Sequence, residues 1–102
     1  MLLPTRAVFV GDGSLLIRCA DAFRAAGHEI AGIASRDPAV LEWARQQGVA
    51  AELVQQQPEL AGCEFDYLFS VGWLHLLPHA LLHRPRRGSL NFHDGPLPRY
   101  AG

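Results

Sequence analysis

Cysteine, net charge and long apolar runs are all scarce in this sequence. Its 102 residues include two cysteines, Cys19 and Cys63, neither of them in a Cys-x-x-Cys motif or a metal-type histidine spacing, which argues against a disulfide framework or structural zinc. The formal net charge is −1 without a charged block, so neither nucleic acid nor an anionic membrane is expected as the main partner. No window approaches the ~20 apolar residues of a membrane span, and the N-terminus lacks a signal-peptide pattern. We expect a soluble, cytoplasmic protein.

Short apolar segments alternate with stretches of helical periodicity along the chain. The first helix is expected over 14–26, with Ser14 as its N-cap and Gly27 as its stop. The second helix is expected to start at Pro38, to be capped by Asp37 and to end at Gly48. A short third helix is expected over 76–82. The strands are expected at residues 7–10, 29–34, 49–54, 65–71 and 89–92.

This alternation predicts the fold class. Strands that are apolar throughout and alternate with helices are typical of parallel sheets covered on both faces. We predict an α/β fold with a doubly wound, mainly parallel, Rossmann-like sheet, in a single domain over residues 1–102. Ligands of such sheets bind beyond the carboxyl ends of the strands. Three segments qualify, at residues 11–14, 70–77 and 91–102.

The turn after the first strand invites a comparison with dinucleotide-binding domains. The sequence Gly11-Asp12-Gly13-Ser14 is followed by two leucines, so the third glycine of the G-x-G-x-x-G fingerprint is missing. The second strand ends in Ser35-Arg36 instead of the acidic residue that reads a ribose hydroxyl. An arginine suits a 2′-phosphate, so a nucleotide-binding domain of an oxidoreductase stays open as an alternative. We favour a tight structural turn that walls one side of a site.

A polar pair stands out on the last strand. Asn91 and His93 point to the same side of a strand whose other side carries Leu90 and Phe92. An asparagine amide can donate a hydrogen bond to an oxygen that gains charge as a carbonyl carbon becomes tetrahedral, and a histidine can accept a proton from an attacking amine. The pair therefore suits acyl-type transfer. A purely structural role for two satisfied polar groups remains equally open on spacing alone.

The C-terminal stretch carries a family resemblance. The run Asn-Phe-His-Asp-Gly-Pro-Leu-Pro-Arg-Tyr-Ala-Gly over 91–102 resembles the Asn-x-His…Leu-Pro-(basic)-x-x-Gly signature of the formyltransferases that use 10-formyltetrahydrofolate. Residues 69–78 and Pro85-Arg86-Arg87-Gly88 resemble the strand and turns that precede this signature. Asp94-Gly95-Pro96 departs from the commoner Gly-Ser-Leu or Pro-Ser-Leu. The resemblance implies the N-terminal part of a formyltransferase domain, with a sheet incomplete at its C-terminus and truncated after the catalytic loop.

The resemblance also implies a set of site residues. Asn91 and His93 are the expected catalytic pair, while an aspartate that completes the family's triad would follow beyond Gly102. Arg99 and the turn of Gly11, Asp12, Gly13 and Ser14 are the expected substrate-binding residues. The expected cofactor-binding residues, acting largely through backbone groups, are Ser70, Val71, Gly72, Trp73, Leu74 and Leu77.

The implied activity is transfer of a formyl group from 10-formyltetrahydrofolate to a primary amine, without a metal. The amine can belong to a free, tRNA-bound or carrier-bound amino acid or to an amino sugar. The chain also resembles formyltransferase-like domains of nonribosomal peptide and polyketide assembly lines, so a non-catalytic module is a second alternative.

Other polar clusters are assigned structural roles. His75, His79 and His83 recur every fourth residue, but Pro78 interrupts their face and no acidic residue is nearby, so we expect a solvated helix edge and not a metal site. A basic cluster of Arg84, Arg86 and Arg87 is expected to be a solvated turn.

Overall fold

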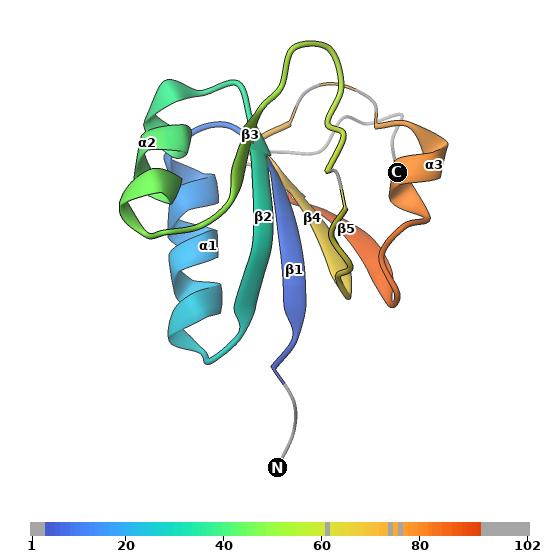
Figure 1. Cartoon of the computed structure of the whole chain (residues 1–102), viewed down its shortest axis with the longest axis horizontal. Helices are drawn as coiled ribbons and strands as arrows, with labels where there is room; N and C mark the ends of the chain where they lie inside the picture. The colour runs from blue at the N-terminus through green and yellow to red at the C-terminus, as the bar shows by residue number, and fades with distance from the viewer. Residues whose placement is uncertain (1–3, 61, 74, 76, 93–102) are drawn as a thin grey trace.

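One five-stranded sheet forms the centre of the protein (Figure 1). The computed structural model describes residues 4–60, 62–73, 75 and 77–92. All neighbouring strands pair in parallel, in the order β3-β2-β1-β4-β5. The strands are β1 (Arg6–Gly11), β2 (Glu29–Ser35), β3 (Ala51–Leu53), β4 (Tyr67–Val71) and β5 (Gly88–Phe92). The predicted Rossmann-like α/β fold is confirmed.

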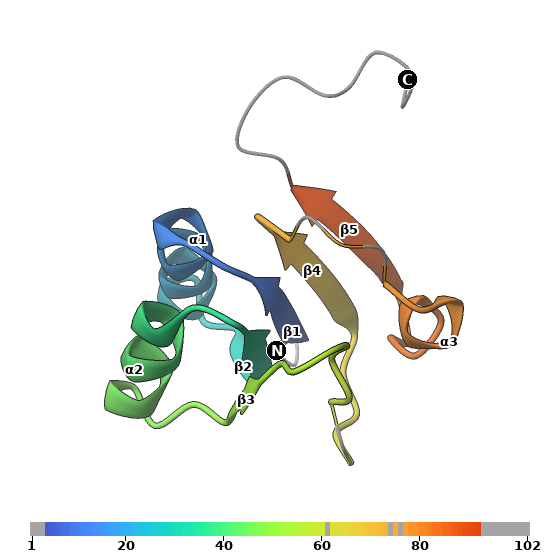
Figure 2. The same cartoon turned by 90° about the horizontal axis from the view of Figure 1, so that it is seen from above.

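Two helices, α1 (Ser14–Ala25) and α2 (Pro38–Gln46), cover one face of the sheet (Figures 1 and 2). Phe9 lies at the centre of this helical face, where its ring makes edge contacts with Phe23 at 5.6 Å and with Phe69 at 5.2 Å between centroids. The buried residues of this core are Ala7, Phe9, Leu16, Ala20, Ile33, Val40, Ala44 and Val71.

The helix ends follow local rules with one exception. Asp37 caps α2 as predicted, since its Oδ1 accepts the backbone N–H of Ala39 at 2.9 Å and Pro38 occupies the first position. The prediction of Ser14 as N-cap is wrong, because Ser14 is already the first residue of α1 and Gly13 is the cap, without a side-chain hydrogen bond. The N–H of Gly13 instead donates to Oδ2 of Asp37 at 2.9 Å. The carboxylate of one cap thus serves both helix starts.

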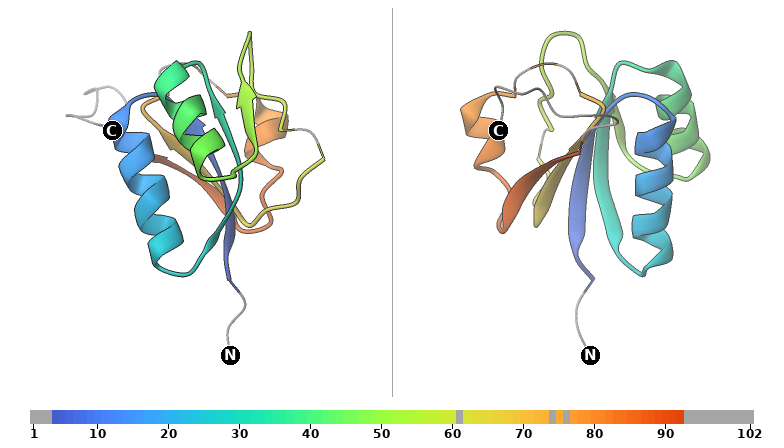
Figure 3. Two further views of the ribbon diagram at one scale, coloured as in Figure 1. Left: turned by 60° about the vertical axis from the view of Figure 1, so that its left-hand side comes forward. Right: turned by 180° about the vertical axis from the view of Figure 1, so that it is seen from behind.

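The opposite face is covered by irregular chain and by the single-turn helix α3 (His79–Leu82), as the views from the side and from behind show (Figure 3). The expected helix over 76–82 is wrong at residues 77 and 78, because a residue that precedes a proline avoids the helical region and α3 begins only after Pro78. Residue 76 lies outside the described residues. The buried residues of this core are Val8, Val10, Ala34, Val54, Leu60, Phe65, Leu68, Trp73 and Leu81.

Two charged side chains hold the irregular segment in place. The carboxylate of Glu52 accepts the backbone N–H groups of Glu59 and Leu60 at 2.8 and 2.9 Å. The guanidinium of Arg84 donates to the carbonyl oxygens of Glu59 at 2.8 Å, Leu60 at 2.7 Å and Cys63 at 3.2 Å. These two side chains therefore satisfy backbone N–H and carbonyl groups that no regular secondary structure pairs in this segment. They anchor the segment over the sheet, where Leu60 is 5% exposed.

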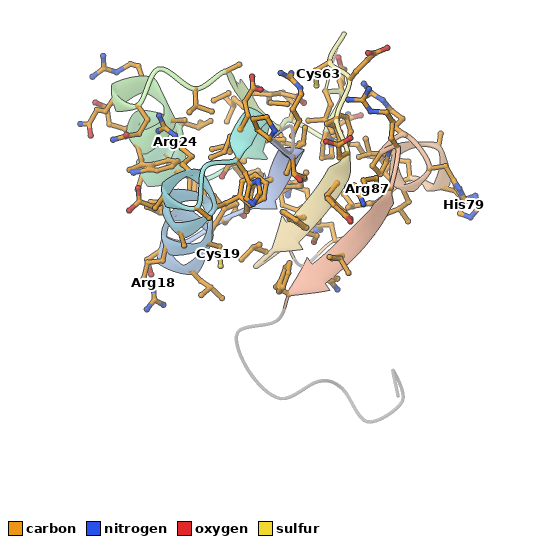
Figure 4. The ribbon with its side chains drawn as sticks, turned by 90° about the horizontal axis from the view of Figure 1, so that it is seen from below. Arg18, Cys19, Arg24, Cys63, His79 and Arg87 are labelled. Carbon is orange, nitrogen blue, oxygen red and sulfur yellow. The ribbon has the colours of Figure 1, made fainter. Side chains whose placement is uncertain are left out.

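The two cysteines belong to opposite faces (Figure 4). Cys19 packs against the core under α1 and α2, whereas Cys63 packs against the core of the other face. The sheet therefore separates the two thiols, and both are free. Among the described helices, none has the length and apolar character required to cross a membrane.

Candidate ligand-binding site

The carboxyl ends of β1 and β4 meet at the point where the strand order reverses. Within the plane of the sheet, β2 and β3 lie to one side of β1, and β4 and β5 lie to the other. This junction is the switch point at which such sheets bind ligands. A Cβ on Gly11 would lie 1.7 Å from the carbonyl oxygen of Val71. Gly72 has φ +68°, and a Cβ there would lie 2.7 Å from the carbonyl oxygen of Asp12. Only glycines allow the two strand ends to approach this closely.

The turn after β1 is tied to the turn after β2. Oδ1 of Asp12 accepts the hydroxyl of Ser35 at 2.8 Å and the backbone N–H of Arg36 at 2.9 Å. The buried Ser35 hydroxyl oxygen in turn accepts the N–H of Asp37 at 3.0 Å. These bonds fix the position of the turn, and its role as a wall of the site remains a prediction. The expected contacts of Gly11, Asp12, Gly13 and Ser14 with substrate remain a prediction.

A cavity of about 270 Å³ lies on the face opposite α1 and α2, beside β4 and β5. It brings together four residues singled out in the sequence, Ser70, Trp73, Leu77 and Asn91. Two further predicted residues have structural roles. The Val71 side chain belongs to the helical-face core, and Gly72 packs closely against the backbone of Asp12. The full lining is Leu68, Ser70, Trp73, His75, Leu77, Leu82, Ser89, Leu90 and Asn91.

Asn91 reaches the cavity because of its register in β5. It pairs with Ser70 across the parallel ladder, so the two side chains leave the same face of the sheet. Phe92 pairs with Val71, and its ring contacts Phe69 on the helical face at 5.8 Å. Asn91 and Phe92 thus leave opposite faces of the sheet as predicted, whereas Leu90 also lines the cavity. His93, Leu74 and Arg99 lie outside the described residues.

Trp73 forms a wall of the cavity and is 6% exposed. Within the described part of the chain, its indole N–H has no hydrogen-bond partner. The face of its ring carries the guanidinium of Arg36, 5.1 Å from the ring centroid, and its edge meets the ring of His75 at 5.2 Å. His75 lies within the segment 70–77 that was expected to form part of a ligand site, but it was not named among the cofactor-binding residues and was also expected on a helix face. The position of this segment directly after a strand was the signal that pointed to the pocket.

The other two histidines lie at the far side of α3. Nε2 of His79 and Nε2 of His83 are 3.2 Å apart on exposed side chains, and His79 points away from the sheet (Figure 4). The expected helix edge of three histidines is wrong for His75, which precedes α3 and contacts Arg36. The described residues contain no group of three His, Cys, Asp or Glu side chains that could hold a metal ion.

The chain is similar in sequence to known proteins over almost its whole length. No protein-family model matches it. Methionyl-tRNA formyltransferase of Sphingopyxis alaskensis is 28% identical over 115 residues, which cover 95% of this chain and 38% of the relative. The enzyme of Ruegeria pomeroyi is 30% identical over 115 residues, with the same two coverages. That of Rhodopseudomonas palustris (strain BisB5) is 28% identical over 118 residues, covering 98% of this chain and 38% of the relative.

The chain therefore spans about 38% of the length of these relatives. The similarity extends over nearly all of this chain, and it agrees with the resemblance that the C-terminal motif indicated. The sheet order at the switch point is also that of a Rossmann-like domain. Taken with its parallel sheet, these similarities support a formyltransferase-like domain.

Proposed function

We propose that this chain is the N-terminal, cofactor-binding portion of a formyltransferase that transfers a formyl group from 10-formyltetrahydrofolate to a primary amine. The observation that carries the proposal is the cavity that Asn91 shares with Ser70, Trp73 and Leu77. The names of the relatives support a tRNA-bound amine as one class of acceptor. Carrier-bound amino acids and amino sugars are the other classes that experiment must separate.

The cavity suits a ring system of the size of a reduced pterin. Its volume of about 270 Å³ lies near the lower end of the ~300–1,000 Å³ typical of small-molecule pockets, so it fits one part of a folate and not the whole molecule. Leu68 and Leu77 provide apolar walls. The buried indole N–H of Trp73, which has no partner among the described residues, can donate to a ring nitrogen or oxygen.

The proposed chemistry assigns one task to each polar residue of the motif. The amide of Asn91 donates to the formyl oxygen as the amine nitrogen bonds to the formyl carbon, and loss of such a donor costs ~100- to 1,000-fold in rate. His93 accepts the proton that the amine loses. The bond between the formyl carbon and N10 then breaks, N10 receives that proton, and tetrahydrofolate leaves.

Binding can be tested on this chain with its own tryptophan. Trp43→Phe leaves Trp73 as the single tryptophan, because the sequence contains two. Titration with 5-formyltetrahydrofolate, a stable analogue of the donor, should give a saturable change in Trp73 emission, and Ser70→Leu should abolish it by filling the cavity. A response to NADPH and none to the folate would refute the proposal in favour of a nucleotide-binding domain.

Catalysis is tested in the protein that carries this chain. Asn91→Ala and His93→Ala should each lower formylation of an amine acceptor by ~100-fold or more. Phe92→Leu is the matched control, since Phe92 neighbours both residues but leaves the opposite face of the sheet. Product formation that is unchanged in both variants would mean a non-catalytic module.

A further inference from the structure

Arg36 stands at the carboxyl end of β2, directly after the strand, and its side chain reaches across the switch point toward the cavity. Its Nη1 lies 3.0 Å from Nε2 of His75, and its Nη2 donates to the carbonyl oxygen of Gln56 at 3.1 Å. Its guanidinium carbon lies 5.1 Å from the centre of the Trp73 ring. His75 and Trp73 both line the cavity, so Arg36 contacts two of its walls from outside.

These contacts orient the guanidinium but do not neutralise it. Since an arginine N–H can only donate, the contact requires the tautomer of His75 in which Nε2 accepts. The Gln56 carbonyl and the Trp73 ring are likewise uncharged partners. These groups thus fix the orientation of the Arg36 guanidinium, and its positive charge can still bind an anion.

No carboxylate among the described residues forms an ion pair with Arg36. The neighbouring Asp37 caps α2, and the carboxylate of Asp12 accepts the Ser35 hydroxyl and the backbone N–H of Arg36, not its guanidinium. Nε of Arg36 is buried and has no hydrogen-bond partner within the described part of the chain. A half-buried cation with an unused donor is unfavourable until an anion meets it.

We propose that Arg36 recognises an anionic group, a carboxylate or a phosphate, on the ligand whose ring enters the cavity. This inference rests on the proposed function for the identity of that ring. Two sources have the required chemistry, namely the glutamate carboxylates of the folate donor and an anionic group of the amine acceptor. Trp73 and His75 are positioning residues for the guanidinium.

The donor is tested with a pair of probes in the Trp43→Phe background. Arg36→Gln should weaken binding of 5-formyltetrahydrofolate by about tenfold or more, because charge-assisted hydrogen bonds are lost. The same variant should bind 6-methyltetrahydropterin, which has the ring and no carboxylate, as tightly as the parent. Arg36→Lys should restore part of the folate affinity. Arg18→Gln, an exposed arginine on α1, is the control and should change neither affinity (Figure 4).

Four outcomes decide whether Arg36 binds an anion and which ligand carries that anion. Equal weakening of both probes by Arg36→Gln would overturn the proposal, since Arg36 would then only support the cavity. If 5-formyltetrahydrofolate fails to bind the parent at all, the proposed function fails, and the Arg36 Nε–H resonance is followed by NMR with free glutamate and with inorganic phosphate. A saturable shift with phosphate but not glutamate would assign the anion to a phosphate-bearing ligand. No shift with either anion would overturn the anion site itself.

Discussion

The two faces of the sheet are built by different means. On the helical face, α1 and α2 lay regular apolar stripes on β1 and β2, and Phe9, Phe23 and Phe69 interlock edge to edge. On the other face, irregular chain is held by single side-chain hydrogen bonds from Glu52 and Arg84, and α3 adds one turn. The cavity that contains Asn91 opens on this second face.

The difference shows how one small domain separates stability from ligand binding. Regular helices pack without leaving space, whereas irregular chain anchored at a few points leaves a cavity beside the strand ends. Substitutions on the helical face should therefore change the free energy of unfolding and leave ligand affinity intact. Substitutions around the cavity should change ligand affinity, whether or not they also change the free energy of unfolding.

The largest effect is expected from Phe9→Ala. Phe9 is 2% exposed, and truncation of a buried phenylalanine costs about 3–5 kcal/mol through lost transfer energy and a cavity. Urea unfolding followed by circular dichroism measures it. Leu68→Ala on the other face should cost about 2–5 kcal/mol and also alter folate affinity, because Leu68 lines the cavity. Equal effects on affinity from both variants would contradict the separation of the faces.

Gly11→Ala should destabilise the junction between the faces by about 3 kcal/mol or more, since a methyl group would overlap the Val71 carbonyl. Gly32→Ala in the adjacent strand β2 is the matched control. A Cβ at Gly32 meets its nearest atom at 3.8 Å, so this variant should unfold at a denaturant concentration close to that of the parent. Similar midpoints for the two variants would show that the strand ends can move apart.

Arg84→Met should cost about 1–3 kcal/mol, because three carbonyl oxygens of the irregular segment lose their donor while the side chain keeps its length. Hydrogen exchange should accelerate at residues 59–65 and not in α1. Uniform acceleration over the whole chain would argue that this segment does not open independently.

Trp73→Phe is expected to change stability by less than about 1 kcal/mol. It keeps an aromatic ring in the wall and removes an indole N–H that has no partner among the described residues. Folate affinity should nevertheless fall if that N–H serves the ligand, as calorimetric titration would reveal. Unchanged affinity would remove the N–H from the proposed site.

The smallest effect concerns Asp66. The backbone N–H of Arg6, 2.9 Å from Oδ2, and the nearby Arg86 and Arg87 lower the pKa of this carboxyl below its ordinary value. A carboxyl whose pKa is lowered by folding stabilises the protein above its unfolded pKa, about 3.9, and this contribution is lost as the pH falls through the folded pKa. The difference in melting temperature between the parent and Asp66→Asn should therefore shrink from pH 6 to pH 3. A constant difference would contradict the assignment.

Local rules predicted much of this architecture and failed at identifiable places. Asp37 and Pro38 mark the start of α2 because capping depends on a few neighbouring residues. Ser14 fails as a cap because the acceptor at that helix start is Asp37, 24 positions from the Gly13 N–H that it binds. The third helix was predicted too long because apolar periodicity outweighed the effect of Pro78 on the residue before it.

The candidate site was predictable in part for the same reason. Asn91, Ser70 and Trp73 follow or end apolar strands, and the ends of parallel strands gather at one edge of a sheet. The partnership of Arg36 with His75 was not predictable, since it joins residues 39 positions apart whose contact depends on the path of two loops.

Uninterrupted apolar strands and well-placed helix caps were enough to specify a parallel α/β sheet, because these signals act through neighbouring residues. Two features were decided only by the tertiary structure. These are the cavity and the absence of an ion pair between Arg36 and any carboxylate of the described residues. Both depend on which distant loops meet, and on how closely Gly11 and Gly72 allow the strand ends to approach.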